Sequence, residues 1–126
     1  MDIVNLGFFR EFPHGDPNGE SIKPCLAKGD AAVKDLVAGY LEQGSTLAAT
    51  AQRVFDVLDE NKPDAGALAM ITDGAWIWPA DLPYYVRKYN ISLPVKFVEH
   101  AKRSNWKPAE VSHQDLVDIE NALFAG

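Results

Sequence analysis

The chain has 126 residues, 47% hydrophobic and 24% charged, which is typical of one globular domain spanning residues 1–126. Its net charge of −6 argues against nucleic-acid binding, because phosphate contacts need clustered lysines and arginines. The single cysteine, Cys25, excludes an internal disulfide, and no apolar run reaches the ~20 residues that span a bilayer. We therefore expect a cytoplasmic protein without membrane contact.

Residues 1–29 are expected to be mostly irregular, because prolines and glycines interrupt any period, with one short strand near residues 3–9. Two helices are predicted next, over residues 30–44 and 45–58, each with apolar residues at helical spacing. Asp30 would cap the first helix and Gly44 would follow its end. The short connection predicts that the two helices form an antiparallel αα-hairpin, followed by a loop over residues 61–66.

A β-hairpin is predicted over residues 68–78, where two β-prone runs flank Asp73-Gly74. A two-residue type I′ turn would pair Thr72 with Ala75, and Ile71 with Trp76. Pro79 would end the second strand, because it has no N–H to donate. A hairpin with two apolar faces is marginal in water by itself, so helices must cover it.

Three more helices are predicted after the hairpin, capped by Asp81, Ser92 and Ser112. The first of them carries an inward stripe of Leu82, Tyr85, Val86 and Tyr89. Residues 106–111 are expected to form a connection, with or without a short strand. The predicted fold class is therefore α+β, with about five helices packed on a small antiparallel hairpin.

Candidate catalytic groups are sparse. None of the three histidines has a second histidine or a cysteine at the spacing of a metal site, so no metal or other cofactor is expected. His100 and His113 are expected on the surface, and Cys25 is expected to be buried as a small apolar residue. Residues 87–107 hold six basic residues and only one acidic residue. They form either the solvated faces of two helices or a basic patch for an anionic partner.

Two stretches of the sequence, GFFREFPHGDPNGESI (7–22) and TDGAWIWPADLPYYVRKYNISLPVKF (72–97), resemble a family of small bacterial proteins. The family pattern runs approximately GFFRELPHGDPxGPS and then TDGxWxWPxDLxYYV, from which this chain departs at Phe12 and Glu20. Such proteins are similar to acidic immunity proteins that are encoded beside secreted toxins. The resemblance implies a stoichiometric complex with a cognate toxin and supplies no catalytic residues.

The candidate partner-binding surface combines the N-terminal loop with the turn of the hairpin. The N-terminal loop over residues 11–20 is acidic, and its prolines and glycines restrict its conformation. A restricted loop loses little conformational entropy on binding. Trp76, Trp78 and Tyr85 are expected mainly to clamp the fold, while Tyr84 lies off the inward stripe. The candidate residues are Glu11, His14, Asp16, Glu20, Asp73, Trp76 and Tyr84.

Three hypotheses about function follow. The first is an immunity protein that neutralises a toxin, and the second is a non-catalytic scaffold or regulatory module. The third is a small enzyme or ligand binder that uses the His14 loop, and it requires a concave pocket beside His14. The partner's identity and the oligomeric state do not follow from the sequence.

Overall fold

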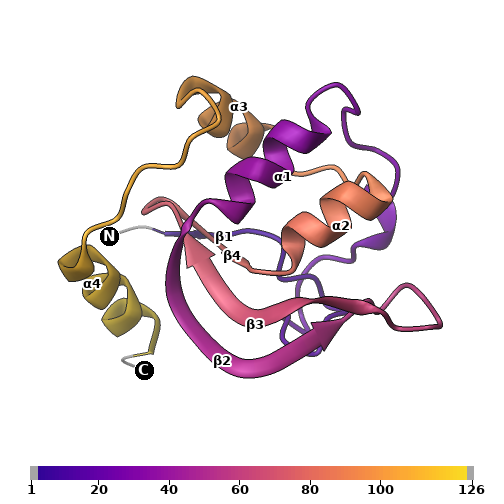
Figure 1. The fold of residues 1–126 in the computed structure, drawn as a ribbon, viewed down its shortest axis with the longest axis horizontal. Coiled ribbons are helices and arrows are strands. Elements are labelled where there is room, and N and C mark those ends of the chain that lie inside the picture. Colours follow the sequence, from indigo (N-terminus) through magenta and orange to yellow (C-terminus); the bar gives the residue numbers. More distant parts are fainter. Residues whose placement is uncertain (1–2, 125–126) are drawn as a thin grey trace.

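A four-stranded mixed sheet and four α-helices make up the fold of residues 3–124, the part that this computed structural model describes (Figure 1). The strand order is β1-β4-β3-β2, with β1 parallel to β4 and the other neighbours antiparallel. The elements are, in chain order, β1 (Val4–Asn5), the 3₁₀ turn η1 (Lys23–Cys25), α1 (Lys34–Glu42), β2 (Ser45–Phe55), β3 (Asp64–Thr72), β4 (Trp76–Pro79), α2 (Leu82–Tyr89), α3 (Val95–Arg103) and α4 (His113–Phe124).

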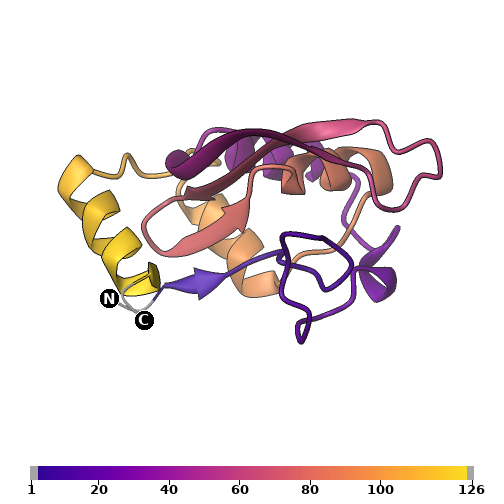
Figure 2. The ribbon, with the colours of Figure 1, turned by 90° about the horizontal axis from the view of Figure 1, so that it is seen from below.

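The two faces of the sheet pack against different helices. Along β4, Trp76 and Trp78 join the main core, which also contains buried residues of α1, α2 and α3. Ile77 between them points to the opposite face, where it packs with Leu47 of β2 and Ile119 of α4. Figure 2 shows α4 (yellow) at one end of the molecule, and the loops of the N-terminal segment (indigo) lie away from that end. The α+β class is therefore correct.

The predicted helix over residues 45–58 is wrong, and with it the αα-hairpin. Residues Ser45–Phe55 form β2, a long edge strand that pairs antiparallel with β3. The helical spacing of Leu47, Ala51 and Val54 is misleading, because Ala51 is exposed while the other two are buried. Pairing along β3 overrides a spacing that fits a helix about as well as a strand. The predicted loop over residues 61–66 also ends early, since β3 begins at Asp64.

The predicted hairpin exists, with a wider turn and a shifted register. Thr72 pairs with Ile77, and Ile71 pairs with Trp78, so that three residues separate the strands. The Asp73 carboxylate causes this difference, because Oδ1 accepts the N–H groups of Ala75 at 2.9 Å and Trp76 at 2.8 Å. A side chain that satisfies these donors replaces the type I′ turn. Pro79 ends β4, as predicted.

The remaining helices agree with the prediction in position but less so in their caps. In α2, Leu82, Tyr85 and Val86 are buried, as the stripe predicts. Ser112 caps α4 as expected, since its Oγ accepts the Asp115 N–H at 3.1 Å. Helix α3 begins after Pro94 rather than after Ser92. The segment between α3 and α4 lies within the described residues and contains no strand.

Candidate functional site

The N-terminal segment is ordered by hydrogen bonds of its own. The Glu11 carboxylate accepts the Ser21 hydroxyl and, at 2.9 Å, the Ile22 N–H. Burial opposes ionisation of Glu11, but these two hydrogen bonds outweigh it and hold the pKa of Glu11 below its usual value. The Arg10 N–H donates to the Glu20 carbonyl at 2.9 Å and closes the same loop. The segment is therefore a fixed surface.

His14 joins this segment to the start of α2. Its Nε2 lies 3.0 Å from Oδ1 of Asp81, a residue 67 positions away that is only 1% exposed. The imidazole also stacks on Phe12, with ring centroids 5.0 Å apart. Asp81 precedes α2 as predicted, but its side chain makes no capping hydrogen bond and turns to His14 instead. His14 Nδ1 and Asp81 Oδ2 are both buried without a hydrogen-bond partner among the described residues.

Gly15 allows this arrangement because there is no room for a side chain. A Cβ at Gly15 would lie 1.9 Å from the carbonyl oxygen of Phe9. We therefore expect Gly15→Ala to displace the loop, break the His14–Asp81 contact and lower the free energy of unfolding by about 2 kcal/mol or more. Chemical denaturation measures the stability, and the ¹⁵N-edited NMR signals of the His14 ring report the contact.

Gly39→Ala is the control, because a Cβ there would lie 3.8 Å from Gln43 Nε2, an ordinary contact, and alanine favours a helix interior. Equal stability of the two variants would contradict the tight packing at Gly15.

Two adjoining hollows lie on either side of His14, and we call them together the groove. The narrow hollow has a volume of about 190 Å³ and the wide hollow about 510 Å³, and both are lined by His14 and Leu68. The narrow hollow is also lined by Phe8, Ala48, Ala49, Thr50, Ala69, Met70 and Pro79. The wide hollow is also lined by Pro13, Gln52, Arg53, Val54, Phe55, Asp56, Val57 and Lys62.

The two hollows differ in chemistry. The narrow hollow is almost wholly apolar. Phe8 and Met70 in its wall also pack against the cluster of Leu47, Ile77 and Ile119, which places the hollow on the face of the sheet that α4 covers. The wide hollow combines Phe55, an aromatic residue that is 52% exposed, with the charged residues Arg53 and Lys62. The groove can therefore accept a group that is apolar at one end and polar at the other.

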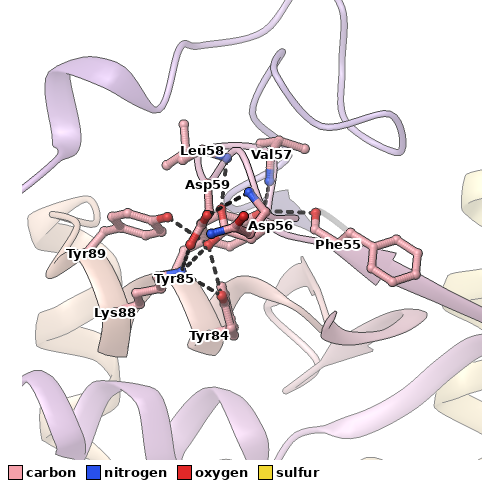
Figure 3. A network of polar contacts seen from close by, with 10 residues as sticks. Phe55, Asp56, Val57, Leu58, Asp59, Tyr84, Tyr85, Lys88 and Tyr89 are labelled. Atoms are coloured by element: carbon pink, nitrogen blue, oxygen red, sulfur yellow. Dashed lines mark hydrogen bonds and ion pairs between the residues drawn. The ribbon is translucent and has the colours of Figure 1, made fainter. Parts of the chain in front are cut away.

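Asp56 anchors the far end of the groove to α2 (Figure 3). Its carboxylate is fully buried and accepts the Leu58 N–H, the Tyr84 and Tyr89 hydroxyls and the Lys88 ammonium group, all within 2.9 Å. Burial raises the pKa of Asp56, but Lys88 and then Tyr89 outweigh this effect and lower the pKa to about 2. The end of β2 is therefore rigidly attached to α2.

Asp73 forms a second buried contact, away from the groove. Its Oδ2 accepts the Tyr40 hydroxyl at 2.5 Å and lies 3.0 Å from His100 Nε2. Burial, followed by the hydrogen bond to Asp73, raises the pKa of Tyr40. His100 is therefore half-buried against Asp73 rather than on the surface as expected, whereas His113 is exposed.

The seven predicted site residues do not form one surface. Asp16 and Glu20 are exposed and line a third hollow of about 230 Å³, which shares Phe8 with the narrow hollow. Glu11 and Asp73 are engaged in the contacts described above, and Trp76 packs on Phe97 at a centroid distance of 5.3 Å. Tyr84 is half-buried and donates to Asp56. Of the seven, His14 alone lines the groove.

The groove residues of β2 and β3 were not predicted from the sequence. Ala48, Arg53 and Phe55 lie in the segment that the apolar spacing assigns to a helix, so the sequence did not place them beside His14. The threonines and the aromatic residue within residues 45–55 were the available signal for a strand.

The basic segment over residues 87–107 is partly neutralised. Arg87 contacts Asp35 at 3.0 Å and Glu42 at 2.6 Å, and Lys88 contacts Asp56 and Asp59, each at 2.8 Å. The other four basic residues of the segment are exposed, on α3 or just after it.

Comparison with protein-family models, curated proteins and solved structures finds no match to this chain. Within residues 3–124, no group of three or more histidines, cysteines or carboxylates is arranged to hold a metal ion. None of the helices in that part of the chain is both long and apolar enough to cross a membrane.

Proposed function

We propose that this protein is a stoichiometric binding protein that holds a segment of a partner protein in the groove. The observation that carries the proposal is the continuity of the two hollows across His14 and Leu68, along the exposed side of β2. Their walls include exposed positions such as Ala49, Gln52 and Phe55, so the groove is open along its length. An open groove suits a segment of a macromolecule better than an enclosed small ligand.

The residue types in the wide hollow support binding to a protein. Aromatic residues and arginine are enriched in protein interfaces, where a few such side chains supply most of the affinity. Phe55 and Arg53 are both exposed beside the hollow. The groove is also preordered, because Asp56 fixes one end and the His14–Asp81 contact fixes the middle. A preordered groove loses less conformational entropy when a partner binds.

The position of the His14 nitrogens favours binding over catalysis. Nε2 faces Asp81 and Nδ1 is buried, so neither nitrogen is presented to the groove. A general base must lie within hydrogen-bond reach of the proton that it removes. In our proposal His14 contributes ring surface to the groove, and Asp81 holds the ring in place.

The narrower form of the proposal is that the partner is a toxin which this protein neutralises. Its support is the resemblance of residues 7–22 and 72–97 to a family of small bacterial proteins that are similar to immunity proteins. The net charge of −6 favours encounter with a basic partner, an effect that weakens as salt is added.

Filling the narrow hollow is expected to abolish partner binding. Ala48 pairs with Met70 and faces the same side of the sheet, so Ala48→Phe extends a ring into the hollow. The partner is first sought as the product of the neighbouring gene, and its affinity is measured by calorimetry. We expect Ala48→Phe to weaken binding at least 100-fold, and to remove any protection of cells that express that product.

Ala51→Phe is the matched control. Ala51 is exposed on the same strand and lines neither hollow, so this variant should bind and protect like the unmodified protein. Thermal unfolding checks that both variants are folded. Full binding by a folded Ala48→Phe variant would refute the groove as the binding site. A partner that binds but harms no cell would refute the toxin and leave the binding function.

A further inference from the structure

The charged residues around the wide hollow give the groove a local preference for an anionic group. Its charged lining residues are Arg53, Lys62 and Asp56. The Asp56 carboxylate is fully buried and accepts four hydrogen bonds, one of them from the Lys88 ammonium group, so its oxygens are already engaged within the protein. Arg53 is paired with Asp64, whereas Lys62 forms no ion pair within residues 3–124. Lys62 is therefore the unpaired cation in the lining of this hollow, in a protein that is acidic overall.

The Arg53 guanidinium group and the Lys62 backbone are held in place by the chain around them. Arg53 donates from Nε and Nη2 to the Asp64 carboxylate, at 2.9 and 2.8 Å, which leaves Nη1 outside that pair. Both partners are about half exposed, and such pairs contribute little in water, so an incoming carboxylate can share the guanidinium group. The Lys62 N–H donates to the Asp59 carbonyl at 3.0 Å and so fixes the backbone of Lys62 in the β2–β3 loop.

The narrow hollow sets the second requirement. Phe8, Leu68 and Met70 surround it, and the small side chains of Ala48 and Ala69 leave its volume of about 190 Å³. That volume holds one large apolar side chain, and burying such a side chain contributes about 1.5–3 kcal/mol. Because His14 and Leu68 belong to both hollows, the apolar group and the anionic group of a ligand must be close neighbours.

The shape of β2 argues that the ligand is held by its side chains and not by strand addition. Ala49 pairs with Ala69 and Arg53 pairs with Ala67, so β2 advances by four residues over the stretch in which β3 advances by two. Such a bulge interrupts the pairing pattern and blunts an edge strand against a further strand. The Gln52 N–H is already bonded to Thr50 Oγ1 at 3.1 Å.

We infer that the groove recognises a peptide segment of its partner in which a large apolar residue is adjacent to an acidic residue. The apolar side chain fills the narrow hollow, and the carboxylate lies between Arg53 and Lys62. This inference rests on the proposed function and names the chemistry of the segment that the groove holds.

Four blocked dipeptides test the inference on the full chain: Ac-Phe-Glu-NH2, Ac-Phe-Gln-NH2, Ac-Phe-Lys-NH2 and Ac-Ala-Glu-NH2. Their binding at millimolar concentration is followed by ¹⁵N NMR. We expect Ac-Phe-Glu-NH2 to shift the amide signals of residues 48–57 and 66–70. It should bind about threefold more tightly than the Gln peptide, and about tenfold more tightly than the Ala peptide. The Lys peptide should bind most weakly of the three Phe peptides, and 0.5 M NaCl should reduce the difference.

Lys62→Gln should reduce the difference in affinity between the Glu and Gln peptides, whereas Lys107→Gln, at an exposed position outside the groove, should change nothing. Equal binding of the Glu and Lys peptides to the unmodified protein, or shifts confined to other residues, would overturn the inference. A different result would contradict the proposed function alone. If Ala48→Phe no longer binds the peptides but still binds the partner, the groove has the inferred preference and the partner binds elsewhere. If Ala48→Phe loses the partner but Lys62→Gln keeps it at full affinity, the groove binds the partner without the acidic contact.

Discussion

Asp56→Asn is expected to lower the free energy of unfolding by about 2–4 kcal/mol at pH 7. Asp56 is fully buried, and its carboxylate is the acceptor shared by Tyr84, Lys88 and Tyr89. An asparagine side chain keeps the volume but loses the charge, and its NH₂ group is a hydrogen-bond donor placed where the surrounding groups are also donors. Urea unfolding measures the difference. Because the network connects the end of β2 to α2, the variant should also loosen the wide hollow.

The same contact predicts how stability depends on pH. The pKa of Asp56 is lowered to about 2 in the folded protein, from an ordinary value of 3.8. A group with a lowered folded pKa stabilises the protein above its unfolded pKa and loses that contribution as the pH falls toward the folded pKa. Asp56 should therefore contribute about 2 kcal/mol above pH 4, and this contribution should disappear between about pH 4 and pH 2.

Urea midpoints between pH 2 and pH 7 test this dependence. Asp56→Asn should show a flatter profile below pH 4 than the unmodified protein does. Asp59→Asn is the matched control, since Asp59 contacts the same Lys88 but is 28% exposed, and we expect it to lower stability much less than Asp56→Asn does. Equal losses in the two variants would show that the burial of Asp56 does not matter.

The sequence predicted the fold where local signals act alone. Helix α2 follows from the stripe of Leu82, Tyr85 and Val86, and Trp78 and Tyr85 are fully buried as expected of residues that clamp the fold. Ser112 and the run of apolar residues after it predicted α4. In each case the period of the side chains and a nearby cap agree, so local and tertiary preferences point to the same structure.

The prediction failed where distant residues decide. Residues 45–55 satisfy a helical period, and only their pairing with β3 makes them a strand. Gly44 was predicted to follow the end of a helix, and it does. A Cβ at Gly44 would also lie 2.7 Å from Trp78 Cζ2, and this close approach depends on the sheet rather than on the local sequence. Asp81 was expected to cap α2, and its contact with His14 across 67 residues carries no local signal.

Only part of the candidate site was predicted, because the rest of it also depends on contacts between residues far apart in the sequence. His14 was singled out from its loop, and it lies at the centre of the groove. The residues opposite it belong to β2 and β3, which the sequence placed in different kinds of element. Acidic residues such as Glu11 and Asp73 suggested a surface for a partner, yet their carboxylates are bonded within the protein.

Asp73→Ala is expected to cost more stability than Gly74→Ala, which reverses the order for a type I′ turn. Such a turn needs positive φ at both central residues, so its glycine would matter most. Here only Gly74 of the two has a positive φ, at +94°, and a Cβ there would approach Val111 no closer than 3.7 Å. The strain of an alanine at this φ should cost about 1–2 kcal/mol.

Removing the Asp73 carboxylate has larger consequences, because it leaves the Tyr40 hydroxyl and the N–H groups of Ala75 and Trp76 without their acceptor. Tyr40 is 1% exposed, so its hydroxyl cannot turn to water without disturbing the core. Each buried donor left unsatisfied costs about 1–3 kcal/mol, and we expect a total loss of about 3–5 kcal/mol for Asp73→Ala. Urea unfolding of both variants at pH 7 measures the order. A larger loss for Gly74→Ala would mean that backbone conformation, and not the buried carboxylate, holds the β3–β4 connection against α1 and α3.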